Sequence, residues 1–154
     1  MVEPILFVCT GNTCRSPMAE AIWRAMGFDA SSAGVSAWSG QSAAVHAQEA
    51  VKRYGGTLNS HRARDLDEIA DDPQLVLTMT AAQRDWVIAR RPNWKDRTLC
   101  LGDAAGEPGD IRDPVGQDLS CYEAVAAEIF RLLVLLKEKL EHGPSKAGGN
   151  DNNT

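Results

Sequence analysis

A short apolar run near the start of the chain constrains the fold more than any other feature. Four residues that favour β-strands follow one another there: Ile5, Leu6, Phe7 and Val8. Because such a strand has no polar face to turn toward water, it fits the centre of a parallel sheet that is covered on both faces. Residues 75–79, with the sequence LVLTM, predict a second buried strand.

Segments with helical features separate the strand candidates. After the first run, Ser16 can cap a helix, Pro17 suits its first turn, and Gly27 can end it. A second helix is predicted over residues 43–54, where two glycines stop it. A third helix, with a capping box at its start, is predicted over residues 80–90.

The remaining elements are a weaker strand over residues 28–35, a short strand over 98–101, a loop over 102–113 and a long final helix. Ser120 and Glu123 match a capping box at the start of this last helix. Its apolar residues keep helical spacing: Tyr122, Val125, Ile129, Leu133, Leu136 and Leu140.

Strands that alternate with helices predict an α/β fold with three layers, a parallel sheet with helices on both faces. Ligands bind such sheets at the carboxyl ends of the strands. The first strand ends at Cys9, which places this residue at the expected ligand site.

The length of 154 residues fits one domain, which we expect over residues 1–142. The last residues, 143–154, have the sequence GPSKAGGNDNNT and are expected to be disordered. With 44% apolar and 24% charged residues, the rest of the chain has the composition of an ordinary globular protein.

Charge and cysteine content restrict the partners and the compartment. A formal charge of -5 argues against a nucleic-acid partner, because such proteins usually present a basic face. Cys9, Cys14, Cys100 and Cys121 are too scattered for a disulfide framework or a paired zinc motif. The start, MVEPILFVCTG, lacks the features of a signal peptide, and no apolar run approaches the length of a membrane span. We therefore expect a cytoplasmic protein with no membrane partner.

The segment that carries chemistry is CTGNTCRS, residues 9–16, between the first strand and its helix. A loop in this position can point successive backbone N–H groups inward, and the positive end of the helix faces the same point. Such a loop binds phosphate. The predicted phosphate-binding residues are Thr10, Gly11, Asn12, Thr13, Cys14, Arg15 and Ser16.

Cys9 is the candidate nucleophile. Amide dipoles, a guanidinium and a helix N-terminus all stabilise a thiolate. The planar guanidinium of Arg15 matches two oxygens of a phosphoryl group, and Ser16 can donate a hydrogen bond to the sulfur.

A departing group needs a proton, so the mechanism requires an acid from a separate element. The pair Asp113 and Pro114 lies in the predicted loop, and proline restricts the backbone just after the acid. We expect Asp113 to act as general acid, and afterwards to activate the water that cleaves the phosphocysteine. Arg15 and the amides neutralise the phosphoryl oxygens, so neither a metal nor a cofactor is expected.

Cys14 lies in the same loop as Cys9. Peroxide could convert Cys9 to a sulfenic acid that Cys14 traps as a reversible disulfide. The alternative is that Cys14 is a small residue packed under the loop.

These motifs resemble the low-molecular-weight protein tyrosine phosphatase family, which includes bacterial protein arginine phosphatases. The pattern CxxxxxRS is followed about a hundred residues later by DPxG, and SAGVSAW at 32–38 and HRAR at 61–64 are also similar to family segments. The resemblance implies a four-stranded parallel sheet and a phosphorylated protein as substrate, with inorganic phosphate as product. It also implies that Asn12, Ser32 and His61 form a hydrogen-bond network that holds the loop. Trp38 and Tyr122 would line the substrate cleft.

The resemblance leaves the phosphorylated residue open. Thr13 is shared with the arginine phosphatases, where most tyrosine-specific members carry an aliphatic residue, and this favours phosphoarginine. Trp38 resembles the aromatic wall of the tyrosine-specific members and would pack against a phenyl ring.

Two other functions remain as alternatives. An arsenate reductase would need further cysteines after the third strand, but residues 80–95 contain none. A phosphate-binding module without turnover would need neither Cys9 nor Asp113.

Overall fold

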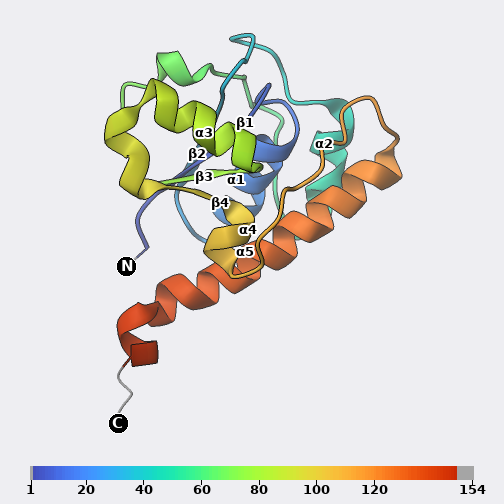
Figure 1. Ribbon diagram of the computed structural model, residues 1–154. Coiled ribbons are helices and arrows are strands. Elements are labelled where there is room, and N and C mark those ends of the chain that lie inside the picture. The colour runs from blue at the N-terminus through green and yellow to red at the C-terminus, as the bar shows by residue number, and fades with distance from the viewer. Residues whose placement is uncertain (1, 149–154) are drawn as a thin grey trace.

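Four parallel strands form the centre of the molecule within residues 2–148, the part of the chain that the computed structural model describes (Figure 1). The strands lie in the order β2-β1-β3-β4. Their bounds are β1 (Ile5–Cys9), β2 (Ala30–Gly34), β3 (Leu75–Thr78) and β4 (Thr98–Cys100). The predicted class, a four-stranded parallel sheet between helices, is confirmed.

Side chains of β1 alternate between two apolar cores because successive residues of a strand point to opposite faces. Ile5, Phe7 and Cys9 belong to the larger core, whereas Leu6 and Val8 belong to the smaller one on the other face. All five residues are buried, which explains why the run contains no polar side chain.

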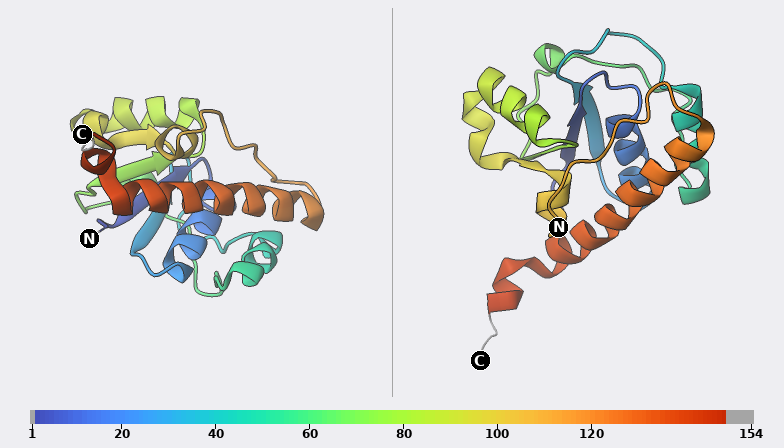
Figure 2. Two further views of the ribbon diagram at one scale, coloured as in Figure 1. Left: turned by 90° about the horizontal axis from the view of Figure 1, so that it is seen from below. Right: turned by 45° about the vertical axis from the view of Figure 1, so that its right-hand side comes forward.

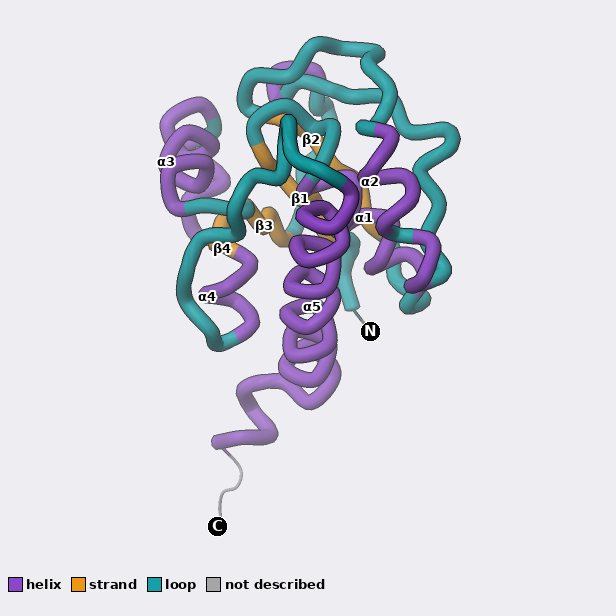
Figure 3. Tube along the Cα trace, turned by 90° about the vertical axis from the view of Figure 1, so that its right-hand side faces the viewer, coloured by secondary structure: helices purple, strands orange, loops and turns teal. Residues whose placement is uncertain are grey.

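Helices cover both faces of the sheet (Figure 2). The larger core lies under α1 (Arg15–Ala25), α2 (Val45–Ala50) and α5 (Leu119–Gly148), and the smaller core lies under α3 (Ala81–Arg90). Figure 3 shows α3 on one side of the strands and α1 and α2 on the other. Among the described residues, no helix combines the length and apolar character needed to cross a bilayer.

The predicted loop over residues 102–113 is partly wrong, because a short helix, α4 (Leu101–Ala105), directly follows β4. It ends at Gly106, whose φ of 88° lies in the left-handed region that glycine tolerates. The backbone then returns against the helix, and a side-chain carbon on Gly102 would lie 2.7 Å from the carbonyl oxygen of Glu107. Glycine at position 102 therefore reflects this close packing and not a loop conformation.

Two predicted helix caps are also wrong. Ser16 does not cap α1, because the helix begins one residue earlier at Arg15. Asp118, and not Ser120, caps α5: its Oδ1 accepts hydrogen bonds from the Cys121 backbone N–H at 3.1 Å and from the Ser120 hydroxyl at 2.8 Å. The capping box predicted for α3 is confirmed.

The final helix is longer than expected. It continues to Gly148, past the boundary predicted at residue 142. The rest of the predicted disordered tail, residues 149–154, lies outside the described residues. The predicted apolar face of α5 is buried except at its end, where Leu140 is 36% exposed.

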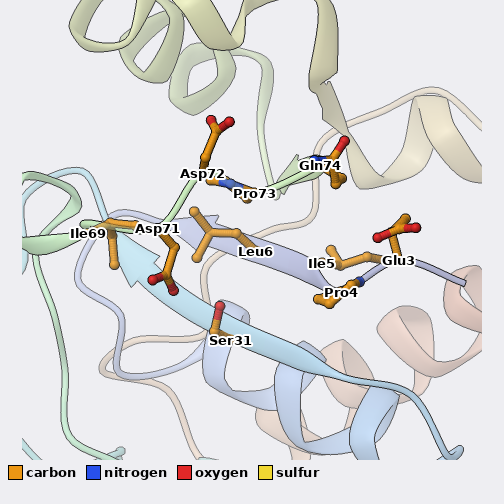
Figure 4. Close-up of a pocket in the computed structure, with 10 residues that line it drawn as sticks. All are labelled: Glu3, Pro4, Ile5, Leu6, Ser31, Ile69, Asp71, Asp72, Pro73 and Gln74. Carbon is orange, nitrogen blue, oxygen red and sulfur yellow. The ribbon is translucent and has the colours of Figure 1, made fainter.

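A pocket of about 270 Å³ lies at the edge of the sheet where β1 begins, opposite to the end of β1 at Cys9 (Figure 4). It is lined mainly by carboxylate, amide and apolar side chains: Glu3, Pro4, Ile5, Leu6, Ser31, Ile69, Asp71, Asp72, Pro73 and Gln74. None of the predicted catalytic residues lies in it.

Candidate active site

Asn12 determines the shape of the loop between β1 and α1. It is fully buried and has a φ of 58°, a left-handed conformation that asparagine tolerates better than most residues. Its side-chain amide donates to the Ser16 and Ser32 hydroxyls, both at 2.9 Å, and its Oδ1 accepts from the Arg64 backbone N–H at 2.9 Å. These three hydrogen bonds hold the loop in its turn.

Cys9 lies at the end of β1, with its Sγ 2.9 Å from the Ser16 Oγ. The Ser16 oxygen accepts a hydrogen bond from Asn12, so the Ser16 proton is free to point elsewhere. The hydroxyl can donate to the Ala33 carbonyl oxygen, 3.4 Å away, or to the Cys9 sulfur, with which either atom can be the donor. A hydroxyl that donates to sulfur stabilises the thiolate form.

Arg15 is the first residue of α1, and its guanidinium is buried next to the loop. Nη1 donates to the Ile111 carbonyl oxygen at 2.7 Å, which orients the planar group. Nη2 lies 3.6 Å from Oδ2 of Asp113. The contact brings together two residues that are far apart in the sequence.

Asp113 lies in the segment between α4 and α5, and its side chain is 45% exposed. Its Oδ1 accepts a hydrogen bond from the Val115 backbone N–H at 3.1 Å. One cavity of about 210 Å³ contains the sulfur, the guanidinium and the carboxylate. Its lining residues are Cys9, Thr10, Gly11, Thr13, Cys14, Arg15, Asp113 and Val115.

A chain of hydrogen bonds supports the loop from behind. The Nε2 of His61 lies 2.8 Å from the Asn12 carbonyl oxygen, which can only accept, so this ring nitrogen carries the proton. The Ser32 hydroxyl donates to Oε1 of Glu20 at 2.6 Å. The structure thus brings Asn12, Ser32 and His61 together, as the resemblance implied.

Three further residues that support the loop, directly or through Ser32, were not singled out from the sequence. Glu20 lies four residues after Ser16 on α1, and this spacing places both on one helix face and could have revealed it. The Arg64 backbone N–H donates to Asn12, a contact that leaves no signal in the residue type, and its guanidinium donates to the Ser32 carbonyl oxygen at 3.2 and 3.3 Å. Gln83 donates from Nε2 to the Thr10 hydroxyl at 3.1 Å. The sequence indicated only its role in the capping box of α3 and not this contact with the loop.

Tyr122, expected in the substrate cleft, does not line the cavity that contains Cys9. This residue is 4% exposed and lies beneath the loop, where its hydroxyl is 3.3 Å from the Cys14 sulfur. Its place at the start of the apolar stripe of α5 explains its burial. Trp38 is 83% exposed and does not line the cavity either.

Cys14 is buried next to Tyr122, and burial raises the pKa of its thiol. Burial likewise raises the pKa of Tyr122, so both groups stay protonated at neutral pH. Cys9 and Cys14 are both free thiols in the structure. The trapping of an oxidised Cys9 by Cys14 stays a prediction.

Positive charge in the cavity comes from the chain itself. Arg15 supplies a guanidinium, and the N-terminus of α1 supplies partial positive charge. Among the described residues, no group of three or more His, Cys, Asp or Glu side chains is arranged to hold a metal ion. The arrangement suits the binding of a phosphoryl group beside a thiol.

Comparison with known proteins agrees with this geometry. The family described as low molecular weight phosphotyrosine protein phosphatase matches residues 4–145. A protein-arginine-phosphatase of Geobacillus stearothermophilus is 42% identical over 142 residues, 89% of this chain and 95% of the relative. The low molecular weight protein-tyrosine-phosphatase PtpB of Staphylococcus epidermidis is 31% identical over 140 residues, 89% of this chain and 99% of the relative.

A solved structure extends the similarity to three dimensions. It is a mutant of YwlE arginine phosphatase with a phosphorylated active site serine, and it has a TM-score of 0.85 and 32% identity over 93% of this chain and 99% of that chain. The phosphorylated serine shows that a phosphoryl group can be attached covalently in the active site of that protein. The family match spans the loop, the cavity and nearly all of the sheet and helices, so the chain belongs to the low molecular weight phosphotyrosine protein phosphatase family and is a cysteine-dependent protein phosphatase.

Proposed function

We propose that Cys9 is the nucleophile of this phosphatase, that Arg15 holds the phosphoryl group and that Asp113 is the general acid. The observation that carries the proposal is the single cavity that all three side chains line, with the guanidinium 3.6 Å from the carboxylate. A cavity of about 210 Å³ has room for a phosphoryl group and the first atoms of the side chain that bears it.

The reaction has two steps. In the first, the Cys9 sulfur anion attacks phosphorus and forms a P–S bond, while the bond from phosphorus to the leaving oxygen or nitrogen breaks. The leaving atom keeps the electron pair and takes a proton from Asp113. In the second step, water attacks phosphorus, gives its proton to Asp113 and displaces the thiolate, so that inorganic phosphate is released. The Ser16 hydroxyl, 2.9 Å from the sulfur, stabilises the thiolate as it departs.

Replacement of the nucleophile tests this mechanism. We expect Cys9→Ser to abolish phosphate release from a phosphopeptide, because a serine hydroxyl is a much weaker nucleophile at neutral pH.

Asp113→Asn tests the general acid. It should keep the fold and lower kcat by about 100-fold, because an asparagine side chain cannot donate the proton that the leaving group needs. Cys121→Ser, which changes a partly exposed cysteine outside the cavity, is the matched control. Unchanged phosphate release by Cys9→Ser would refute the assignment.

We propose phosphoarginine in proteins as the substrate, with phosphotyrosine as the second candidate. Thr13 lines the cavity, whereas Trp38 does not, so the residue that favours phosphoarginine is the better placed of the two. A relative with 42% identity is a protein-arginine-phosphatase, which supports this choice. The phosphotyrosine candidate is supported by the family description and by the tyrosine phosphatase relative.

A substitution at Thr13 tests the substrate. We compare kcat/KM for a phosphoarginine peptide and a phosphotyrosine peptide of the same sequence, in the parent and in Thr13→Ile. We expect the parent to favour phosphoarginine and isoleucine to shift the ratio toward phosphotyrosine, because it fills the cavity with an apolar side chain. Thr57→Ile, an exposed threonine outside the cavity, is the control. Equal ratios in the parent and in Thr13→Ile would remove Thr13 as a selector.

We further propose that the protein acts in the cytoplasm. The four free cysteines support this location, since the cytoplasm keeps thiols reduced.

A further inference from the structure

A second cavity of about 310 Å³ adjoins the catalytic cavity, and the two share Thr10 and Arg15 as wall residues. We refer to this second cavity as the α3 groove. Its remaining lining residues come from the segment after β2, from the residue before α3 and from α3 itself: Val35, Ser36, Thr80, Ala82, Gln83 and Trp86. The groove is therefore continuous with the place where a phosphoryl group binds.

The side chains of Gln83, Thr80 and Thr10 in the groove are already engaged within the protein. The Gln83 side chain accepts hydrogen bonds from the backbone N–H groups of Met79 and Thr80, both at 3.0 Å, and donates to Thr10. The Thr80 hydroxyl accepts from the Gln83 backbone N–H. What the groove offers to a ligand is mainly the apolar surface of its other side chains.

Ala82 and Trp86 supply much of that surface. They lie four residues apart on α3 and therefore share one face of the helix. Trp86 is 53% exposed, and the guanidinium of Arg90 lies 5.7 Å from the centre of its ring, a distance at which a cation restrains an aromatic side chain. Large aromatic residues held in place beside a binding site are typical anchors for protein partners.

We propose that the α3 groove binds an apolar side chain of the protein substrate, two residues away from the phosphorylated residue. This inference rests on the proposed function, because it takes the phosphorylated side chain to occupy the catalytic cavity. Side chains of an extended peptide alternate in direction, so the residue that points the same way as the phosphorylated one is two positions away, about 7 Å along the chain. A groove that shares two wall residues with the catalytic cavity lies within this reach.

The test uses phosphopeptides that differ only in the residue two positions before, or two positions after, the phosphorylated residue. Each position carries Phe, Ser or Lys in turn, and kcat/KM is measured for each peptide. We expect the parent to prefer Phe over Ser by about fivefold at one of the two positions, because the groove removes only part of the phenyl ring from water. Equal values for Phe and Ser at both positions would overturn the proposal.

Two variants locate the preference. Trp86→Ala should reduce the Phe to Ser ratio toward one, because it removes the aromatic wall. Ala82→Glu should favour Lys over Phe at the same position, and a carboxylate in the first turn of α3 also suits the helix. Val134→Ala, which changes an exposed apolar residue of α5, should keep the ratio of the parent.

The outcomes separate this inference from the proposed function. If the parent hydrolyses none of the peptides, with either phosphoarginine or phosphotyrosine, the proposed function fails. If the parent hydrolyses all of them and Trp86→Ala has the same Phe to Ser ratio as the parent, only the groove fails.

Discussion

At the scale of the residue, Asn12 joins the local conformation of the loop to its chemistry. Its left-handed backbone turns the chain back toward α1, and its side chain connects Ser16, Ser32 and the backbone of Arg64. Ser16 in turn contacts the Cys9 sulfur. One buried amide therefore influences both the stability of the loop and the position of the hydroxyl that faces the Cys9 sulfur.

Two substitutions separate the side-chain hydrogen bonds of Asn12 from its left-handed backbone conformation. Asn12→Gly tolerates the positive φ but loses the three hydrogen bonds, so we expect the free energy of unfolding to fall by about 2–3 kcal/mol and kcat to fall with it. Asn12→Ala also strains the backbone and should cost about 1 kcal/mol more. Urea denaturation measures the free energy of unfolding of each variant, and steady-state kinetics measures kcat. Asn59→Gly, at an exposed asparagine, is the control.

If Asn12→Gly proved as stable and as active as Asn59→Gly, the hydrogen bonds of Asn12 would not be needed to hold the loop.

At the scale of the element, the segment from α4 to α5 brings the Asp113 carboxylate to the cavity. Close packing against Gly102 holds its first part, and the hydrogen bond from the Ile111 backbone N–H to the Met79 carbonyl oxygen, at 2.9 Å, ties it to the end of β3. The cap at Asp118 then starts α5. The position of Asp113 therefore depends on attachments on both sides of it.

The cap predicts a dependence of stability on pH. Hydrogen bonds from the Ser120 hydroxyl and from the Cys121 backbone N–H lower the pKa of Asp118 below its usual range. Because the pKa is lower in the folded state, the stabilisation is fully present above the unfolded-state pKa and is lost as the pH falls through the folded-state pKa. We expect Asp118→Ala to lower Tm by a few degrees at pH 7 and by less in acid.

Thermal unfolding followed by circular dichroism measures this difference at several pH values. Asp118→Asn keeps an oxygen that can accept hydrogen bonds but has no titrating group. Its Tm at pH 7 should be close to that of the parent, and its Tm should fall less than that of the parent when the pH is lowered. A difference between the parent and Asp118→Ala that stays constant down to pH 2 would contradict the account.

At the scale of the whole molecule, α5 closes the larger core. Its apolar stripe packs with side chains from β1 and α1, and Leu133 is fully buried there. The same helix carries Tyr122, which lies beneath Cys14 of the phosphate loop. Loss of packing under α5 should therefore affect the fold and the site together.

Substitution of one buried leucine tests this coupling. Leu133→Ala leaves a cavity in the larger core, and we expect it to lower the free energy of unfolding by about 2–5 kcal/mol. Leu140→Ala lies on the same stripe but at its exposed end, so we expect a change below about 1 kcal/mol. Urea denaturation of both variants gives the comparison, and equal losses would show that α5 does not close the core as described.

Local features of the sequence sufficed for the strands and for the phosphate loop. An apolar run such as Ile5 to Val8 is stable mainly as a strand that is covered on both faces. Cys9 and Arg15 lie within a few residues of the end of that strand, so both could be found from the local sequence. The caps were less predictable. Ser16 fits a cap by type, but its hydroxyl turns to Cys9 and Asn12, and no local pattern signals that choice.

The sequence by itself determined the α/β class and which reactive side chains follow the first strand, because burial patterns and side-chain reactivity are properties of short segments. Only the tertiary structure decided that Asp113 meets Arg15, that Tyr122 is buried beneath the loop and that Trp86 borders the site. These contacts join segments distant along the chain. Their geometry depends on how α3 and α5 pack against the sheet, which residue types alone do not specify.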